Sequence, residues 1–325
     1  MFPSISSSKQ KKNIATIAFY NVENLFDTSN DPNTLDDDFT PNGKKKWTYK
    51  RYGIKIKKLG SVISKLGLNR TNTPPALIGL VEVENKKVVS DLANSLYLRK
   101  HHYGVVHYDS PDERGIDVAL LYNKVVFELL DATTYPIYLE DNEGARDYTR
   151  DILKVSGNLH GELVHVLVNH WSSRREGALE TEPKRIAAAK VVREIIEVIK
   201  NKEFDPKIII MGDFNDDPTS KSVQDYMVKD DFFNPMKKLL DKDKSGSLTY
   251  NGKWNLFDQI IFSKNFLEEK EGKLHFKHAE VFNKDWMRVH RGKYKGSPFR
   301  TYVGKWYQGG FSDHFPVYAF LKKKD

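Results

Sequence analysis

Paired polar side chains follow a strongly apolar stretch in the middle of this sequence. Residues 208–211 are four large apolar residues, three of them β-branched, which is typical of a strand buried on both faces. Asp213 and Asn215 follow two residues apart, so both side chains would leave an extended chain on the same side. A carboxylate can accept a proton or bind a metal, and a carboxamide can donate hydrogen bonds to an oxyanion. Taken alone, the pattern also fits an Asx-rich turn that leaves a strand.

The same arrangement recurs along the chain. Further apolar runs are bordered by polar groups, namely Asn21, Glu82, His170, Asp258, and Asp313 with His314. We expect these borders to converge on one site. Carboxylate and amide oxygens are hard ligands that suit Mg²⁺ or Mn²⁺, and histidines and an arginine beside them suit a phosphate whose charge grows in the transition state. The predicted chemistry is metal-assisted hydrolysis of a phosphoester.

The elements that position these residues can be predicted from periodicity. Strands are expected over residues 14–20, 76–81, 103–108, 116–122, 152–155, 163–168, 208–211, 259–262 and 317–321. A turn is expected over 157–161, and residues 123–150 carry little signal. Helical spacing is found over 54–66, from Thr181 to residue 199, and over 222–240 with a break at Pro235.

Composition limits the architecture. The 325 residues are 39% hydrophobic and 12% aromatic, so the chain can bury a sizeable core. Strands and helices interleave to the end, and we expect a single domain over residues 13–321 with helices covering a two-sheet core. Much of the net charge of +8 lies in residues 1–12, expected to be disordered, and in the basic tail 322–325.

Several classes of protein and site are excluded. The absence of cysteine excludes disulfides, thiolate metal sites and a cysteine nucleophile. No run has the length of a transmembrane segment, and the N-terminus has no apolar signal-peptide core. A cytoplasmic location and export with the signal peptide removed fit equally well.

Seven short motifs, taken in their order along the chain, resemble those of a known protein family. The motifs are Tyr20-Asn21-Val22-Glu23-Asn24, Gly79-Leu80-Val81-Glu82-Val83, Arg114-Gly115-Ile116-Asp117-Val118-Ala119, Asn169-His170, Gly212-Asp213-Phe214-Asn215, Asp258-Gln259-Ile260 and Ser312-Asp313-His314. In this order the chain resembles the endonuclease/exonuclease/phosphatase superfamily, which is deoxyribonuclease I-like, and its nuclease-like branch in particular. The resemblance implies an α/β fold, a four-layer α/β/β/α sandwich of two mixed β-sheets flanked by helices.

The resemblance also implies roles for the site residues. Glu82 would be the principal ligand of Mg²⁺ or Mn²⁺, assisted by Asn21 and Asp313. Asp213 would orient and deprotonate the attacking water, and Asn215 would donate to the phosphoryl oxygens. These roles suit an anionic phosphodiester, which repels hydroxide unless the site supplies positive charge.

The histidines complete the implied machinery. His314 would contact the scissile phosphate or the metal, and His170 would stabilise the phosphate. Asp258 resembles the acid that pairs with a histidine and holds its ring as a charged donor. Five other histidines have no partner pattern and are interpreted as surface or core residues: His101, His102, His107, His160 and His165.

Two acids compete with the assigned metal ligands. Glu84 would lie on the same side as Glu82 if the strand alternates regularly, and Glu82 is preferred because it falls at the family's position. Glu23 could bind metal in place of Asn21, or it could be a supporting or surface acid.

Three residues are candidates for substrate binding. Arg114 and Asp117 could contact the substrate directly or form a structural ion pair across a turn. Arg174 could hold a phosphate bidentately or could be a solvent-facing loop arginine.

Two basic segments bear on the substrate. The lysines between residues 44 and 58 are interpreted as the solvated face of a helix. Residues 284–307 interleave seven basic residues with aromatic ones, which fits either polyanion binding or a long loop packed onto the body. A nucleic-acid substrate and an endonuclease are favoured. The alternatives are a phosphatase or phosphodiesterase acting on a lipid, inositol or other small headgroup, and a non-catalytic binding protein that has kept the fold.

Overall fold

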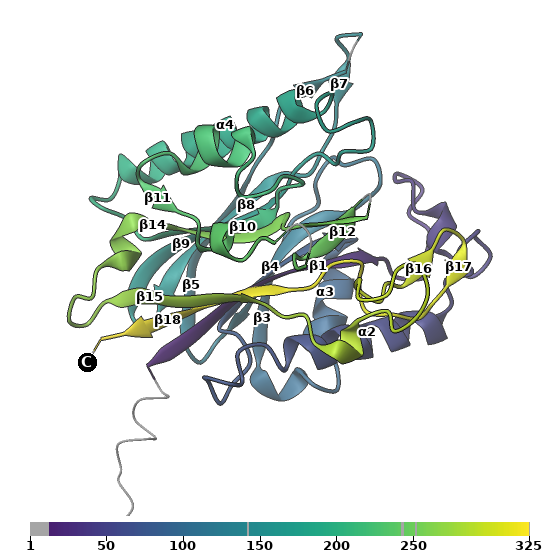
Figure 1. The fold of residues 1–325 in the computed structure, drawn as a ribbon, viewed down its shortest axis with the longest axis horizontal. Coiled ribbons are helices and arrows are strands. Elements are labelled where there is room, and N and C mark those ends of the chain that lie inside the picture. The colour runs from purple at the N-terminus through teal and green to yellow at the C-terminus, as the bar shows by residue number, and fades with distance from the viewer. Residues whose placement is uncertain (1–12, 142, 242–243, 251, 325) are drawn as a thin grey trace, which may run out of the picture.

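The computed structural model describes residues 13–141, 143–241, 244–250 and 252–324. Two six-stranded sheets form the centre of the fold (Figure 1). The first sheet has the order β15-β18-β1-β2-β4-β3. Its strands are β1 (Ile14–Leu25), β2 (Leu77–Val83), β3 (Tyr103–His107), β4 (Asp117–Asn123), β15 (Leu274–Val281) and β18 (Val317–Lys323).

The second sheet has the order β11-β14-β10-β9-β8-β5. Its strands are β5 (Phe127–Tyr135), β8 (Ile152–Leu159), β9 (Glu162–His170), β10 (Ile208–Asp213), β11 (Phe232–Phe233) and β14 (Asp258–Ser263). Three two-stranded ribbons lie outside the sheets: β6 (Leu139–Glu140) with β7 (Arg146–Asp147), β12 (Leu248–Tyr250) with β13 (Lys253–Asn255), and β16 (Tyr302–Val303) with β17 (Trp306–Tyr307).

Helices cover the outer faces of both sheets. Helices α2 (Tyr49–Ile63) and α3 (Lys86–Ala93) pack on the first sheet, and α4 (Glu182–Lys200) packs on the second (Figure 1). Short helical turns join the strands: η1 (Asp37–Phe39), η2 (Arg99–His101), η3 (Ser222–Val228), η4 (Pro235–Lys238), η5 (Lys264–Leu267) and η6 (Asp285–Met287). The expected four-layer α/β/β/α sandwich is confirmed.

The main hydrophobic core lies between the two sheets. Phe19 and Val81 of the first sheet and Ile209 and Met211 of the second are all fully buried there. A Cβ on Gly79 would lie 2.5 Å from the sulfur of Met211, so glycine lets the sheets approach closely at this point. The close packing holds the ends of the two sheets in a fixed relation.

Some sequence predictions of secondary structure are wrong. The expected helix over 222–240 is instead the π-helical turn η3, the short strand β11 and the 3₁₀ turn η4. Pro235 is the first residue of η4 and does not break a longer helix. η3 has already ended at Lys229, whose φ is 43°. Gly157 lies inside β8, so the turn after this strand is confined to His160 and Gly161.

The boundaries of the domain are only partly described. β18 continues to Lys323, so two lysines assigned to the basic tail belong to the first sheet. The predicted disordered segment 1–12 lies outside the described residues. Of the described helices, none is both long enough and apolar enough to cross a membrane.

Candidate active site

Adjacent strands β1 and β2 both lose regular pairing where their polar residues begin. The register shifts between Asn21 and Leu25 in β1 and between Val81 and Val83 in β2. Glu23, with φ of 53°, and Glu82, with φ of 61°, adopt the left-handed conformation in these irregularities. Such a conformation costs about 1–3 kcal/mol for a residue other than glycine and is typical of functional sites.

The irregularity at Glu82 separates two acids that regular alternation would place on one side. The Glu82 carboxylate accepts hydrogen bonds from the Asn21 side chain (3.2 Å) and from the backbone N–H of Asn24 (2.8 Å). Glu84 instead accepts from the backbone N–H of Asp27 (2.6 Å). Burial, together with the nearby acid Asp27, raises the pKa of Glu84 to about 8. The register shift falls at Glu82, between Val81 and Val83, so regular alternation does not relate Glu82 to Glu84, and the two carboxylates bind different backbone groups.

Asn21 joins the two sheets at the centre of the site. Its Nδ2 donates to Oε1 of Glu82 (3.2 Å) on the neighbouring strand and to Oδ2 of Asp213 (3.0 Å) in the other sheet. Its Oδ1 accepts from the backbone N–H of Glu23 (2.9 Å), which fixes the orientation of the amide. In this orientation Asn21 presents its nitrogen to the carboxylates, as a donor that holds them together.

A histidine–aspartate pair bridges the sheets beside Asn21. The Nδ1 of His314 lies 2.6 Å from Oδ2 of Asp258, and its Nε2 lies 3.8 Å from Oδ2 of Asp213. All three side chains are buried. Burial opposes the charged ring, but the carboxylates of Asp258 and Asp213 together outweigh burial and raise the pKa of His314 well above its usual value. The ring is thus held as an imidazolium.

His170 approaches the same carboxylate from the end of β9. Its Nε2 lies 4.0 Å from Oδ2 of Asp213. Burial, and then the charges of Arg150 and Arg114, lower the pKa of His170 well below its usual value, so this ring is neutral. Burial raises the pKa of Asp213 to about 6, against the opposing influence of His314. One charged and one neutral imidazole therefore flank a carboxylate whose pKa lies close to neutrality.

The turn after β10 is an Asx turn and also positions a candidate site residue, so both interpretations of this sequence hold. Asp213 Oδ1 accepts from the backbone N–H of Asn215 (3.0 Å), which is the hydrogen bond of an Asx turn. Asn215, with φ of 49°, turns the chain, and its Nδ2 donates to the carbonyl of Trp171 (3.0 Å). The same turn places Asp213 in the cluster with Asp258 and His314, whose candidate ligand atoms all lie within 4.8 Å of one another.

The donors at this end of the sheets fit a hard divalent cation. Oδ1 of Asp313 is buried and has no hydrogen-bond partner within the described part of the chain, although Oδ2 accepts from Arg300 (2.9 Å). Oδ1 of Asp258 is likewise buried without a partner among the described residues. Buried carboxylate oxygens without donors are favourable only if a cation or proton meets them. Asn21 contacts both segments that carry these acids, because its side chain donates to Glu82 and its carbonyl accepts from Ser312 (2.7 Å), the residue before Asp313.

The predicted substrate-binding residues are in different surroundings. Nη2 of Arg114 donates to the side chain of Asn24 (2.7 Å), next to the backbone that holds Glu82. Arg174 donates to the carbonyl of Asn215 (2.7 Å) and pairs with Asp216, and is therefore a support of the β10 turn rather than a solvent-facing arginine.

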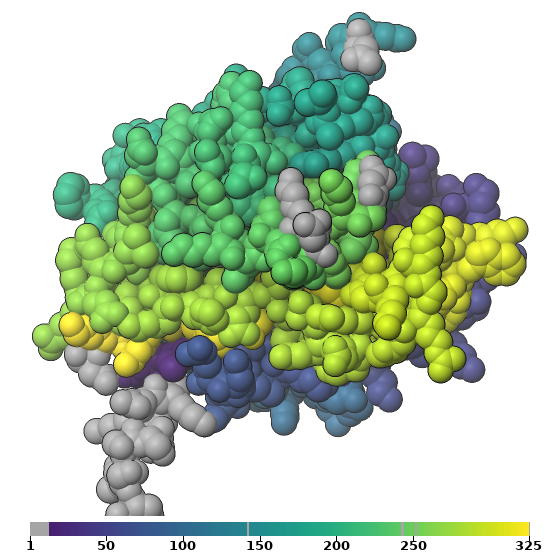
Figure 2. Space-filling view, in the orientation of Figure 1, coloured from purple at the N-terminus to yellow at the C-terminus, as the bar shows by residue number. Residues whose placement is uncertain are grey.

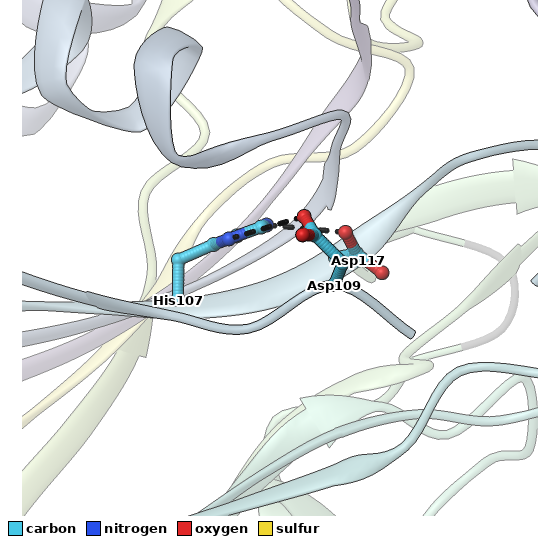
Figure 3. A group of neighbouring side chains, drawn as sticks. All are labelled: His107, Asp109 and Asp117. Atoms are coloured by element: carbon cyan, nitrogen blue, oxygen red, sulfur yellow. Dashed lines mark hydrogen bonds and ion pairs between the residues drawn. The ribbon is translucent and has the colours of Figure 1, made fainter. Parts of the chain in front are cut away.

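Asp117 belongs to a second cluster (Figure 3). Its side chain points toward His107, whose Nε2 lies 3.1 Å from Oδ2, and Nδ1 of His107 lies 3.9 Å from Asp109. Oδ1 of Asp117 accepts from the backbone and the hydroxyl of Ser110 (2.9 and 2.5 Å). Within the described chain no ion pair joins Asp117 to Arg114, so the suggested pair across the turn is not formed. Asp117 fastens the loop that carries Arg114.

A buried network supports the site and was not predicted. The Glu23 carboxylate accepts from Arg300 (3.2 Å) and from the backbone of Thr301 (2.6 Å), and Lys55 lies 3.8 Å away. Lys55 is 1% exposed, so the interpretation of its helix lysines as a solvated face is wrong at this position. Arg300 also binds Asp313. In the sequence, the acid-free run around Lys55 gave no sign that one lysine turns inward.

The chain resembles known proteins in sequence profile and in fold. Residues 16–323 match the profile described as the Endonuclease/Exonuclease/phosphatase family. A comparison with curated proteins found no match. Similar solved structures include truncated Caenorhabditis elegans TDP2 (TM-score 0.58, 15% identity, 97% of this chain and 99% of that chain). They also include D. rerio TDP2 complexed with single strand DNA product (0.57, 14%, 95% and 99%) and Bacteroides thetaiotaomicron mannosyl-6-phosphatase (0.55, 15%, 94% and 99%).

Proposed function

The chain belongs to the endonuclease/exonuclease/phosphatase family of phosphoester hydrolases, and from this premise we propose that it is a phosphodiesterase dependent on Mg²⁺ or Mn²⁺ that cleaves nucleic acid as an endonuclease. One observation carries the proposal. Asn21 hydrogen-bonds both to Glu82 in its own sheet and to Asp213 in the other. Donors and carboxylates from both sheets thus surround one point, as phosphoester hydrolysis requires.

Asp213 is the proposed base for the attacking water. Burial raises its pKa to about 6, so the carboxylate is largely ionised at neutral pH yet basic enough to take a proton. Asn21 and the backbone of Asn215 hold its two oxygens in place. The orientation of the base is therefore fixed before the substrate arrives.

The imidazolium of His314 is the proposed donor to the phosphoryl oxygens. Asp258 keeps the ring charged and oriented through the contact at Nδ1, and Nε2, which lies 3.8 Å from Asp213, would donate to the substrate. His170 supplies a neutral ring on the other side of Asp213. Asn215 has a second amide hydrogen for the phosphoryl group, since a carboxamide carries two donors.

Glu82 and Asp313 are the proposed ligands of the cation, with Asn21 holding Glu82 in position. A bound Mg²⁺ or Mn²⁺ would act as a Lewis acid that neutralises charge on the phosphoryl oxygens. The buried, unpartnered Oδ1 of Asp313 supports this assignment. Arg300 holds the other oxygen of Asp313 and thereby its rotamer.

Two features favour a nucleic-acid substrate over a small headgroup. Basic residues 291, 293 and 295 are exposed in the 284–307 segment, whose Arg300 contacts Asp313, and the structural neighbours include a TDP2 complexed with a single strand DNA product. The alternative, a phosphatase or phosphodiesterase acting on a sugar or other small phosphoester, is supported by the fold shared with a mannosyl-6-phosphatase.

A panel of substrates separates these functions. We would measure metal-dependent turnover of plasmid DNA, abasic duplex, RNA, bis-p-nitrophenyl phosphate, sphingomyelin and mannose 6-phosphate, each with and without EDTA. The proposal expects nicking of a nucleic acid that EDTA abolishes. Turnover of the generic diester or a headgroup ester with every nucleic acid intact would favour the alternative.

A further inference from the structure

A fully exposed phenylalanine lies at the end of the molecule remote from the candidate active site. Phe204 is 99% exposed and belongs to the loop between α4 and β10. β10 begins at Ile208, soon after this residue, and ends at Asp213, so the length of the strand separates Phe204 from the proposed catalytic groups. In Figure 2 the loop forms part of the left edge of the molecule, on the side away from the β16–β17 ribbon. A ring left in water lacks the stabilisation that burial would give it.

The loop that carries Phe204 is fixed on both sides of this residue. Before it, the carboxylate of Glu203 lies 2.9 Å from Nε2 of His165 in β9. After it, Nδ2 of Asn265 donates to the carbonyl and to the carboxylate of Asp205 (2.9 and 3.0 Å). These contacts hold the backbone in place, so burial of Phe204 against a partner would cost little conformational entropy.

A cavity of about 390 Å³ lies directly beside the exposed ring, and Phe204 is one of its walls. The cavity is also lined by Pro206, Ile208 and Phe232. These three residues are buried in the protomer, so they form an apolar floor, and Phe204 forms part of the rim. A protruding aromatic ring and a hollow with an apolar floor are thus neighbours on one surface.

The charges around the cavity indicate which kind of surface it fits. Five charged side chains line it: Lys200, Lys264, Glu203, Asp205 and Asp231. Lys200 pairs with Asp231 (2.6 Å), and Glu203 is held by a histidine. Lys264 and Asp205 are exposed, and neither forms an ion pair within the part of the chain that the structure describes. A polyanion would be repelled by Asp205 and a basic segment by Lys264, whereas a surface with one such charge of each sign complements its own copy.

We propose that this end of the molecule is a self-association surface, on which Phe204 of each of two copies enters the cavity beside Phe204 of the other. A two-fold axis places the same patch on both copies, so each ring meets a cavity and each cavity receives a ring. The same symmetry lets Lys264 of one copy pair with Asp205 of the other, and the reverse. Both candidate active sites stay open, because they lie at the far end of β10. The inference does not depend on the substrate.

Sedimentation velocity over concentrations from about 1 μM to about 1 mM tests the self-association. The wild-type protein should change from monomer to dimer within this range. Phe204→Asp should raise the dissociation constant by roughly thirtyfold or more, the effect of removing a central aromatic residue from an interface. Leu179→Asp is the matched control and should associate as the wild type does. Leu179 is 78% exposed and precedes α4, whose 19 residues separate it from Phe204.

The absence of cysteine from the chain allows a direct test of which surfaces meet. Lys202→Cys, at an exposed position two residues from Phe204, should be cross-linked to a second copy by a short bismaleimide. Leu179→Cys should react with the reagent without being cross-linked. Adding Phe204→Asp to Lys202→Cys should abolish the cross-link but leave the reaction with a monofunctional maleimide unchanged, which shows that the cysteine is still accessible.

Two results would overturn the self-association surface. One is a wild-type protein that remains monomeric at about 1 mM. The other is a dimer whose affinity is unchanged in Phe204→Asp, or is lowered equally by Leu179→Asp. The circular dichroism spectrum and the melting temperature of Phe204→Asp should match those of the wild type, because the replaced side chain lies outside the core. A loss of association in this variant is then a loss of the interface and not of the fold.

Discussion

Asp258 and His314 form a contact of 2.6 Å that spans the two sheets, because Asp258 is the first residue of β14 and His314 lies just before β18. Both side chains are buried, and the histidine also faces Asp213 at 3.8 Å. The pair stabilises a positive charge where no solvent can do so. Because each side chain has a separate proposed role, single substitutions can test the roles one at a time.

Asp213→Ala and His314→Ala should each reduce turnover by roughly a hundredfold or more. The first removes the proposed base and the second removes the charged donor. His314→Ala should also lower thermal stability, because it leaves the buried carboxylate of Asp258 without its charged partner, so turnover is measured well below the melting temperature of each variant. The measurements are kcat on bis-p-nitrophenyl phosphate and a melting curve. Asp285→Asn, at a carboxylate that is 95% exposed, is the control for loss of an acid. Near-wild-type rates in either active-site variant would refute the assigned role.

Chelation should abolish turnover, and Mg²⁺ or Mn²⁺ should restore it. Mn²⁺ affinity, measured by isothermal titration calorimetry, should fall by at least roughly tenfold in Glu82→Gln and Asp313→Asn. Mutation of a residue that only hydrogen-bonds to a metal ligand already has an effect of this size. Added metal should raise the melting temperature of the wild-type protein, because it binds only the folded state. Glu84→Gln is the matched control, since the strand irregularity directs Glu84 toward Asp27. Loss of affinity in Glu84→Gln with none in Glu82→Gln would reverse the assignment.

Lys55→Met should destabilise the fold by about 3–5 kcal/mol, the usual cost of breaking a buried charge pair from one side. Nζ of Lys55 donates to the hydroxyl of Thr301 (2.6 Å) and to the carbonyl of Phe311 (2.7 Å). In the variant these two acceptors lose their donor, and Glu23 loses a nearby positive charge. Urea unfolding measures the change. Adding Glu23→Gln should recover part of the loss, and Lys57→Met on the exposed face of α2 should have little effect. A wild-type midpoint in Lys55→Met would show that the pair is not stabilising.

The sequence predicts the centre of the fold better than its edges. β10 was predictable because both of its faces are buried and residues 208–211 are all large and apolar. β5 was not, because it is an edge strand in which every residue except Phe127 is partly or fully exposed, including Glu128 and Asp131. The helix expected over 222–240 failed because local spacing did not show where tertiary contacts would end each turn.

In the candidate site, residues could be predicted from their chemical type, but contacts between residues distant in sequence could not. The proximity of Glu82, Asp213 and His314 could be predicted, because few residue types suit the proposed chemistry and these types recur where apolar runs end. The role of Arg300 could not, because its partner Glu23 is 277 residues away along the chain and no periodicity connects them. Asn21 was predicted as a metal ligand, and this role stays a prediction; in the structure its amide, oriented by the backbone of Glu23, donates to Glu82 and Asp213.

Asp231→Asn should reduce stability at neutral pH but not in acid. Hydrogen bonds from Arg193 and Lys200 outweigh the opposing effect of burial and lower the pKa of Asp231. A carboxyl with a depressed pKa in the folded state stabilises it above the unfolded pKa of about 3.9, and this stabilisation is lost as the pH falls through the folded pKa. Urea midpoints should differ between variant and wild type at pH 7 and converge near the folded pKa. Asp230→Asn, at the exposed neighbouring acid, should match the wild type throughout. A difference that persists undiminished in acid would assign the effect to packing.

Charge reversal at Arg291, Lys293 and Lys295 should weaken nucleic-acid binding and flatten its salt dependence. These residues are exposed at the tip of a turn whose base is closed by backbone hydrogen bonds between Val289 and residues 296 and 297. Trp286 packs against Phe311 (5.2 Å), so this aromatic residue anchors the segment. The basic residues at the tip are exposed and form no ion pair within the part of the chain that the structure describes, so both interpretations of 284–307 can hold together. Each lost phosphate contact should lower the salt slope by about 0.9 on duplex DNA. Fluorescence anisotropy against salt concentration measures this, with charge reversal at Arg99, Lys100 and Lys124, at the remote end of the first sheet, as the control. An unaltered slope in the 291–295 variant would mean that the segment is structural only.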